Sequence, residues 1–261
     1  TFSNGVTFSG GNFTVPAGVT SFTVTVPTTN DTVDEPNETV ELTVGGTTGT
    51  GTITDDDAAP TVSSVSSNNN TEGLAVVHTV TLSNASSVST TYAISLTDGT
   101  ALGGTDYSTT LTNASFNNGV TISGGTITVP AGVTSFTVSV ATTSDTVDEA
   151  NETYTLTVGG TSGTGTINDD DGAPTISSVT SPTVTEGTDL VYTVSLSNAS
   201  ASATTFAATL GGGASTASAG DFTALASATF SNGVTFSGGN FTVPAAVNGS
   251  PVTVPTTNDT V

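Results

Sequence analysis

The chain has 261 residues and a formal charge of −22, and it contains no lysine, arginine or cysteine. Without cationic side chains it cannot neutralise nucleic-acid phosphates or adsorb to an anionic membrane surface. No apolar run is long enough to span a membrane. The hydrophobic residues are mostly Val, Ile, Leu and Phe set among Thr, Ser and Gly, a composition typical of half-buried strands. We expect a folded, all-β protein with no nucleic-acid partner and no membrane insertion.

An internal repeat of 114 residues organises the chain. Residues 1–57 align with residues 115–171 without a gap, with 44 identities in 57 positions. Residues 229–261 match residues 1–33 at twice that offset, with 28 identities in 33. This period is the size of one β-sandwich domain. The pattern indicates a window on a longer tandem array in which two domains make one repeat.

Two prolines mark the expected domain boundaries. Pro60 and Pro174 each follow an Asp-Asp-Asp run and a two-residue step, and proline fixes the backbone at such a point. We predict the C-terminal half of one sandwich at residues 1–57, a complete sandwich at 58–171 and the N-terminal part of a third at 172–261. The first partners of each sandwich would then be its neighbours in the same chain.

Alternation of apolar and polar residues predicts seven principal strands in the complete repeat. They span residues 61–66, 74–82, 89–96, 126–129, 135–141, 153–158 and 163–167, with a small hairpin turned at Asn118 and Gly119. Short strands without a helical period predict an antiparallel, immunoglobulin-like sandwich. In that fold, the connections after the first, third and fifth strands gather at one pole with the end of the last strand.

The acidic residues fall almost entirely in segments that this fold would bring to one pole. In the complete repeat they are Glu72, Asp106, Asp145, Asp148, Glu149, Glu152, Asp169, Asp170 and Asp171. The flanking repeats place Asp31, Asp34, Glu35, Glu38, Asp55, Asp56, Asp57, Glu186, Asp221 and Asp259 at corresponding positions. Only Glu41, Asp98 and Asp189 lie elsewhere.

Crowded carboxylates without a cation repel one another strongly, even at an effective dielectric constant of about 20. Hard oxygen ligands of this kind are what Ca²⁺ takes, whereas Mg²⁺ demands stricter octahedral geometry and zinc normally recruits His or Cys. We therefore expect Ca²⁺ at the acidic pole. The alternative is that the acids keep the loops soluble or form turns, as Asp145 could do.

Four motifs of the complete repeat resemble the Calx-β domain. They are TEG at 71–73, GTDY at 104–107, DTVDEANET at 145–153 and INDDD at 167–171. The resemblance implies a seven-stranded sandwich whose pole binds Ca²⁺ through acids at these places. In the third repeat the matching Asp221 is displaced by one position, and Ser250 replaces an aromatic residue.

The near-identical tandem repeats and the missing basic residues are similar to the extender regions of large RTX-type bacterial surface adhesins. That likeness implies an extracellular location on a bacterial cell surface. It rests on repetition and composition, whereas the acidic motifs are more specific to Calx-β-like domains.

No group of residues predicts catalysis. The single histidine, His78, lies on the apolar face of its predicted strand, where a packed side chain is the simpler interpretation. Without Cys, Lys or Arg the chain lacks the usual nucleophile–base pairs and phosphate clamps. Two carboxylates alone could serve a glycosidase, but no aromatic platform accompanies them. We expect no enzyme.

Three functions stay open. The leading hypothesis is a structural extender, or spacer, of an extracellular tandem-repeat adhesin or surface fibre, stiffened by Ca²⁺ at its domain poles. The second is a calcium-responsive regulatory module. The third is the body of a self-associating filament, in which like chains would pair in a fibre. Near-identical tandem copies favour the spacer.

Overall fold

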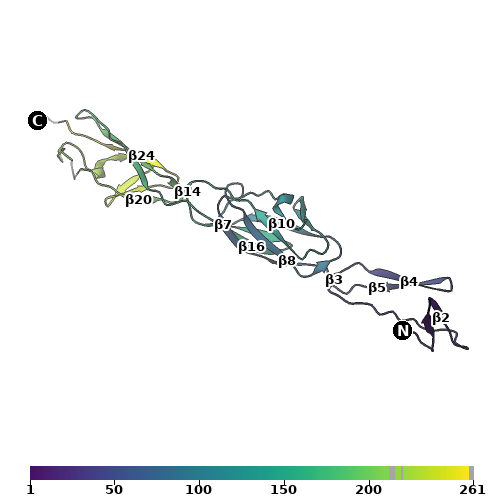
Figure 1. Ribbon diagram of the computed structural model, residues 1–261. Helices are drawn as coiled ribbons and strands as arrows, with labels where there is room; N and C mark the ends of the chain where they lie inside the picture. The colour runs from purple at the N-terminus through teal and green to yellow at the C-terminus, as the bar shows by residue number, and fades with distance from the viewer. Residues whose placement is uncertain (212–214, 219, 259–261) are drawn as a thin grey trace.

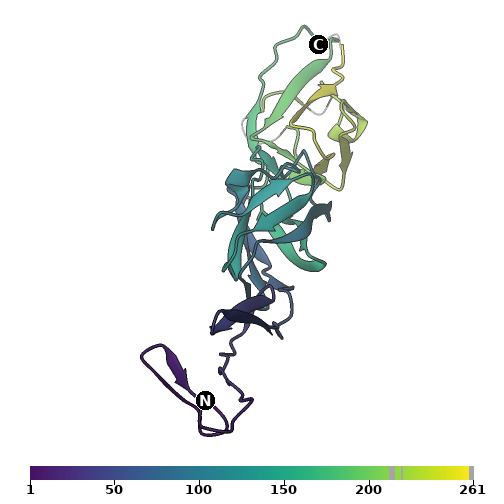
Figure 2. The ribbon, with the colours of Figure 1, turned by 90° about the vertical axis from the view of Figure 1, so that its right-hand side faces the viewer.

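The computed structural model describes residues 1–211, 215–218 and 220–258. Figure 1 shows β-rich units arranged end to end, with the two termini at opposite ends of an elongated molecule. The view turned by 90° shows the same linear arrangement (Figure 2). We call residues 1–57 the N-terminal segment, 58–171 the central sandwich and 172–261 the C-terminal segment. In the described part of the chain, no helix is long and apolar enough to cross a membrane.

The central sandwich is built from two sheets. One contains β6 (Val62–Val65), β8 (Val76–Leu82) and β13 (Ser135–Val140), in the order β13-β8-β6. The other contains β7 (Asn68–Thr71), β10 (Thr90–Asp98), β11 (Thr121–Ser123), β12 (Thr126–Val129), β15 (Glu152–Val158) and β16 (Thr161–Asn168), in the order β11-β12-β10-β15-β16-β7. One turn of 3-10 helix, η1 (Asn113–Ser115), precedes β11. This architecture confirms the predicted all-β sandwich.

The core lies between the two sheets because alternate residues of each strand face inward. Val76, His78 and Val80 of β8 have no solvent exposure, while the residues between them are exposed. From the opposite sheet, Tyr154 and Leu156 of β15 are also fully buried. Each such large apolar side chain contributes about 1.5–3 kcal/mol by its burial. A slip of one residue would turn these side chains to solvent, so the alternation fixes the register.

The first predicted strand differs from the observed one. The sequence predicts a single strand at residues 61–66, but the structure has β6 paired antiparallel with β8, followed by β7 paired parallel with β16 in the other sheet. Asparagine side chains hold β7 in place, because Asn68 Nδ2 donates to Val77 O at 2.8 Å and Asn70 Nδ2 donates to Ala75 O at 2.9 Å. Apolar alternation could not predict a strand that is held by amide side chains.

The two flanking segments contain parts of the same fold. The N-terminal segment has β1 (Thr7–Ser9), β2 (Asn12–Thr14), β3 (Val33–Asp34), β4 (Glu38–Val44) and β5 (Thr47–Ile53). The C-terminal segment has β17 (Ile176–Val179), β18 (Leu190–Leu196), β19 (Ala199–Ser200), β20 (Thr204–Ala207), η2 (Leu225–Ser227), β21 (Thr229–Phe230), β22 (Thr235–Ser237), β23 (Asn240–Val243) and β24 (Gly249–Val254). The hairpin β4–β5 repeats the residue pairing of β15–β16, and β17, β18 and β24 pair as β6, β8 and β13 do.

A two-residue parallel bridge joins each unit to the next. β3 pairs with β9 (Ala85–Ser86), and β14 (Val147–Asp148) pairs with β19. In each case a strand from the loop before the last hairpin of one unit meets the loop after the second strand of its neighbour. Ser87 N donates to Asp34 O at 2.8 Å, and Ala201 N donates to Asp148 O at 2.9 Å. Neighbouring units are therefore connected by backbone hydrogen bonds as well as by the linker.

Candidate metal centre

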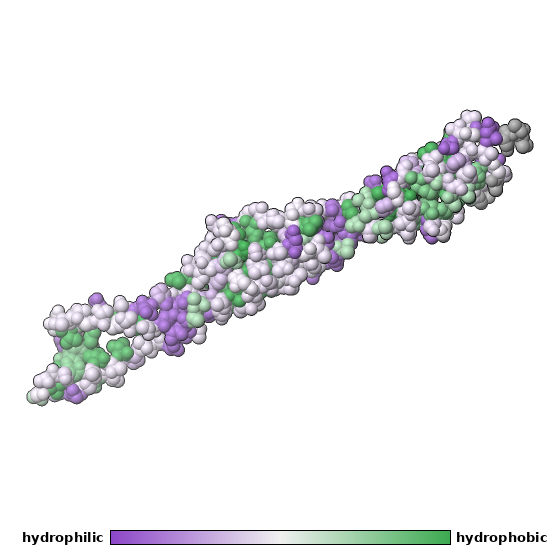
Figure 3. Space-filling model, turned by 180° about the vertical axis from the view of Figure 1, so that it is seen from behind, coloured by the Kyte–Doolittle hydropathy of each residue, from purple (hydrophilic) through white to green (hydrophobic). Residues whose placement is uncertain are grey.

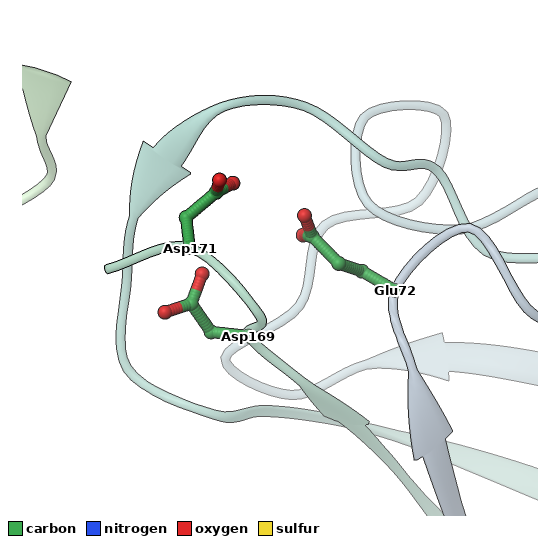
Figure 4. Close-up of side chains that lie close together, drawn as sticks. All are labelled: Glu72, Asp169 and Asp171. Atoms are coloured by element: carbon green, nitrogen blue, oxygen red, sulfur yellow. The ribbon is translucent and has the colours of Figure 1, made fainter. Parts of the chain in front are cut away.

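Among the described residues, Glu72, Asp169 and Asp171 form a group of carboxylates close enough to hold one ion. One oxygen from each lies within 4.8 Å of the others. Figure 4 shows the three carboxylates gathered around a common space at the ends of two strands. The parallel pairing of β7 with β16 brings Glu72 and Asp169 to the same edge of the sheet, and Glu72 N donates to Asn168 O at 3.0 Å.

Two oxygens of this group are buried without a hydrogen-bond partner. They are Oδ1 of Asp169 and Oδ2 of Asp171, and no other buried side-chain nitrogen or oxygen of the described residues lacks a partner. An unsatisfied buried polar atom costs about 1–3 kcal/mol, and more when it is charged. Burial, followed by repulsion from Asp169 and Asp170, raises the pKa of Asp171. Burial is also the main cause of the raised pKa of Glu72. These residues fit a hard cation, which would satisfy both oxygens and neutralise the repulsion.

A second group of acids lies beside the first, around a cavity of about 20 Å³. Asp106, Glu149 and Glu152 line this cavity together with Glu72 and Asp169. Burial raises the pKa of Glu152 to about 7, with further contributions from a hydrogen bond to Asp106 and from its charge. Burial and the surrounding carboxylates also raise the pKa of Glu149. A space of this volume holds about one water-sized particle. The cavity therefore provides oxygen ligands for an ion beside the first cluster.

Asp145 forms the turn that the sequence left open. Its Oδ1 accepts a hydrogen bond from Val147 N at 2.7 Å, and Asp31 makes the same contact with Val33 N at 2.9 Å in the N-terminal segment. Asp145 N also donates to Glu72 Oε1 at 3.4 Å. Asp145 lines the cavity as well, so its role in the turn does not remove it from the acidic pole.

Asp148 contacts the C-terminal segment. Ser200 Oγ donates to Asp148 Oδ2 at 2.7 Å, and Ser200 itself is buried. The acid that the sequence assigns to a metal site therefore already has one partner in the neighbouring unit. Asp34 occupies the corresponding position in β3, which bridges to Ser86 of β9.

A repeated SNAS motif supplies this junction, and sequence reasoning missed its role. It occurs at 83–86 and at 197–200. The side-chain amide of Asn84 donates to Ala58 O at 2.9 Å, and the amide of Asn198 donates to Gly172 O at 2.8 Å. The motif therefore ties the linker to the loop that bridges to the preceding unit. Its recurrence in both repeats was the available signal.

The N-terminal segment contains part of a second acidic pole. A cavity of about 50 Å³ is lined by Asp31, Glu35, Glu38, Asp55, Asp56 and Asp57. Desolvation, followed by repulsion from the surrounding carboxylates, raises the pKa of Glu35 and that of Asp57. The structure brings together these acids from the two loops in which the sequence places them.

In the C-terminal segment, Asp221 takes the place of Asp106 although its motif is displaced by one position. Thr257 N donates to Asp221 O at 2.9 Å, as Thr143 N donates to Asp106 O at 2.9 Å. The carboxylates also match, since each accepts a 2.6 Å hydrogen bond from a backbone N–H a few residues earlier in its own loop. The displacement is therefore absorbed within the loop.

Three other predicted acids lie differently. Glu186 is exposed, in contrast to its counterpart Glu72, which is buried. Asp170 is exposed between the two clustered aspartates. Asp259 lies outside the described residues. The structure thus groups the acids of the central sandwich most completely.

Asp98, which the sequence places outside the pole, has partners of its own. Its Oδ1 accepts hydrogen bonds from Tyr107 Oη at 2.5 Å and from Gly103 N at 2.9 Å. These bonds lower the pKa of Asp98, and burial and the bond to Asp98 raise the pKa of Tyr107 to about 12. Asp98 therefore anchors the connection after β10.

His78 is a packed core residue. Its Nδ1 lies 2.7 Å from Ser66 O, and its Nε2 lies 3.0 Å from Tyr154 Oη. Burial lowers the pKa of His78, so the neutral ring can donate to the carbonyl and accept from the phenol. Tyr154 in turn stacks on Tyr107 with ring centroids 4.7 Å apart. This agrees with the structural interpretation made from the sequence.

Hydrophilic side chains concentrate at the two junctions. Figure 3 shows them in two belts, one between the N-terminal segment and the central sandwich and one between the central sandwich and the C-terminal segment. The acids of each pole therefore lie next to the bridge that connects it to the following unit.

Residues 55–181 match the family profile of the Calx-beta domain. The matched range includes the whole central sandwich and all nine of its clustered acids. Calx-beta domains are calcium-binding β-sandwich modules, which agrees with the cation fit derived above. The comparison with curated proteins found no match.

Similar solved structures include CBD12 from CALX1.2 and the calcium binding domain CBD12 of CALX1.1. The first is 15% identical over 74% of this chain and 75% of that chain, with a TM-score of 0.35. The second is 14% identical over 74% of each chain, with a TM-score of 0.32.

Proposed function

We propose that the chain is a structural spacer of a bacterial surface adhesin or fibre, and that Ca²⁺ at each pole stiffens the junction between neighbouring sandwiches. The observation that carries the proposal is the pair of buried, unpartnered oxygens of Asp169 and Asp171. They lie in the segment that leads directly from the central sandwich into the C-terminal segment. A cation held there would be held at the joint.

Glu72, Asp169 and Asp171 would hold one ion, with Asp106, Glu149 and Glu152 as a neighbouring ligand set. Bound Ca²⁺ supplies positive charge and a shell of about 6–8 oxygens. The protein supplies the positions of those oxygens, because strands β7 and β16 end side by side at this pole.

The proposed coupling to the junction follows from the loop that holds Asp145 and Glu149. The same loop contains β14, which bridges to β19 of the next unit. Carboxylates that repel one another push this loop away from the Asp169–Asp171 run. Neutralising them removes that force and fixes β14 where it can pair.

An extracellular location is supported by composition and by the kind of site. Extracellular modules bind Ca²⁺ with dissociation constants of roughly 10⁻⁴–10⁻³ M, which suits surroundings where the ion is always present. A chain that lacks lysine and arginine also gives trypsin-like proteases no site to cut.

The proposal is tested by small-angle scattering and thermal unfolding of the full chain in millimolar Ca²⁺ and in chelator. We expect chelation to lower the melting temperature and to shorten the maximum dimension, because the junctions bend. A variant carrying Glu72→Gln, Asp169→Asn and Asp171→Asn should behave in Ca²⁺ as the native chain does in chelator at the junction between the central sandwich and the C-terminal segment. Glu41→Gln, which removes an exposed acid outside the pole, is the matched control. Identical profiles with and without Ca²⁺ would overturn the proposal.

The Ca²⁺ affinity separates the spacer from a calcium-responsive regulatory module. Calcium sensors bind with dissociation constants of roughly 10⁻⁷–10⁻⁵ M, well below extracellular concentrations. Titration calorimetry of the full chain should give a value near the millimolar range for the spacer. A sub-micromolar value would favour regulation.

A further inference from the structure

The C-terminal segment has an open apolar face where the central sandwich has its last hairpin. A cavity of about 410 Å³ is lined by apolar side chains from both of its sheets, including Tyr192, Val194, Phe206, Leu210, Phe241 and Val252. In the central sandwich, β15 and β16 cover the corresponding face, and Tyr154, Leu156 and Val158 are fully buried there.

The strands around this face end where their partner is missing. β10 continues through Ile94–Asp98, the five residues that pair with β15, but its counterpart β20 ends at Ala207, and residues 208–211 are not in a strand. Likewise, residues 182–185 are not in a strand, although the equivalent β7 pairs with β16. The C-terminal segment therefore lacks one hairpin and the pairing that this hairpin provides.

The N-terminal segment presents that hairpin unused. In β4 the apolar residues Val40, Leu42 and Val44 are 51%, 42% and 37% exposed, although the equivalent residues of β15 have no exposure. The sequence ETVELTVGGTTGTGTI of β4–β5 matches ETYTLTVGGTSGTGTI of β15–β16, and the residue pairing within the two hairpins is the same. Figure 3 shows apolar surface at both ends of the molecule.

We infer that the hairpin β4–β5 of one copy of the chain docks on the open face of the C-terminal segment of a second copy. The occupant is a second copy because the hairpin and the open face lie toward opposite ends of the elongated molecule (Figure 1). A strand added to an incomplete sheet gains main-chain hydrogen bonds as well as apolar burial. Such a head-to-tail contact does not close on itself, so it propagates into a filament.

The central sandwich fixes the register of the docked hairpin. Leu96 of β10 pairs with Leu156 of β15, which places Leu42 opposite Leu210 of the second copy. By the same equivalence Val40 takes the place of Tyr154, and Tyr192 takes the place of His78. The large ring then comes from the acceptor rather than from the hairpin, so the two facing positions together still hold one tyrosine and one smaller side chain.

This inference goes beyond the proposed function and does not depend on Ca²⁺ binding. The test measures the molar mass of the full chain by light scattering in millimolar Ca²⁺ over a range of concentrations. We expect the average mass to rise from the 25.4 kDa of one chain by about twofold or more as the concentration rises. A mass that stays at 25.4 kDa at every concentration would overturn the inference, including the case in which the chain folds its own hairpin onto its own open face.

Two complementary variants show which surfaces make the contact. Leu42→Asp removes the donor and Leu210→Asp removes the acceptor, so each variant alone should be monomeric. Mixed together, they should form a 1:1 dimer and stop there, because one intact donor and one intact acceptor remain. Thr43→Asp, on the opposite face of β4, should still give filaments. Monomers in the mixture, or filaments of Leu42→Asp alone, would contradict the inference even if one variant were unfolded.

Register is tested by cross-linking, since the native chain has no cysteine. Ser95 pairs with Thr157 in the central sandwich, so Thr43→Cys should form a disulfide with Thr209→Cys of another copy. Thr43→Cys mixed with Thr205→Cys is the out-of-register control. Equal yields for the two mixtures would show that the hairpin does not dock in this register.

Discussion

The hydroxyl of Ser200 donates a 2.7 Å hydrogen bond to the carboxylate of Asp148 across the boundary between two sandwiches. Asp148 belongs to the acidic loop of the central sandwich, and Ser200 belongs to a buried turn of the C-terminal segment. The contact shows that the acidic loop and the mechanical joint are one piece of structure.

Replacing Ser200 with alanine should loosen this joint. A hydrogen bond to a charged group contributes about 1.5–3 kcal/mol, and its loss leaves the two-residue bridge of β14 with β19 as the main direct contact. We expect a shorter maximum dimension in small-angle scattering, with the largest difference in chelator. Ser237→Ala removes an exposed hydroxyl of β22 and should leave the scattering curve unchanged. A Ser200→Ala curve that superimposes on that control would remove Asp148 from the joint.

Stability without Ca²⁺ should fall as the pH rises from about 4.5 to about 7. The pKa of Glu152 is raised to about 7 from an ordinary 4.5, and those of Glu72, Glu149 and Asp171 shift in the same direction. A raised pKa means that the folded state binds protons more tightly, so stabilisation is complete at low pH and is lost as the pH rises through the folded pKa. The lowered pKa of Asp98 acts oppositely, but only at more acidic pH.

Melting curves of the native chain and of Glu152→Gln in chelator, measured across this range, check the prediction. The variant should show a flatter dependence on pH. In millimolar Ca²⁺ the trend should reverse, because ligand carboxylates must be deprotonated to bind the metal. A native chain whose melting temperature is constant from pH 4.5 to 7 in chelator would contradict the raised pKa values.

The pair His78 and Tyr154 should be energetically coupled. Tyr154→Val alone leaves a cavity and removes the partner of His78 Nε2, which should cost about 2–4 kcal/mol. His78→Tyr alone adds a second large ring to a filled core, which should cost about 1–3 kcal/mol. The double variant puts tyrosine on β8 and valine on β15, so its destabilisation should be smaller than the sum by about 0.5–3 kcal/mol. Denaturant unfolding of the four chains gives this value, and strict additivity would show that the positions do not share one space.

Gly165→Ala should destabilise the central sandwich, whereas Gly51→Ala should not. A methyl group on Gly165 would lie 2.2 Å from the ring of Tyr154, while on Gly51 the nearest atom is Val40 Cγ1 at 3.6 Å. Overpacking of this kind costs about 1–3 kcal/mol. Thermal unfolding of the two variants compares equivalent positions of β16 and β5 in the same molecule. Equal melting temperatures would mean that Tyr154 moves aside freely.

The sequence predicted the sandwich because its strands carry regular alternation. Val76, His78 and Val80 face inward in the observed strand as they do in the pattern, and the acids of four separate segments meet at one pole. The division of the first strand into β6 and β7 could not be predicted in the same way. It depends on Asn68 and Asn70, whose amides bond to backbone carbonyls and leave no apolar signal.

The site was predicted at the level of residues but not of their partners. Asp148 was grouped with the other acids, and nothing local in its sequence indicates a bond to Ser200, which is 52 residues away in another unit. The exposed state of Glu186 depends likewise on which strands surround it. Contacts of this kind follow from how units are placed relative to one another, which alternation and spacing do not encode.

Near-identical neighbours on one chain run the risk of exchanging hairpins while they fold, and the core pair of His78 and Tyr154 works against that error. The β15–β16 hairpin placed in the C-terminal segment would set Tyr154 against Tyr192, two rings in the space of one. The β4–β5 hairpin placed in the central sandwich would set Val40 against His78 and leave the imidazole without its phenol partner. Alternating the position of the aromatic residue therefore gives each half-domain a preferred mate, and an array of repeats can emerge from the ribosome with its units correctly assorted.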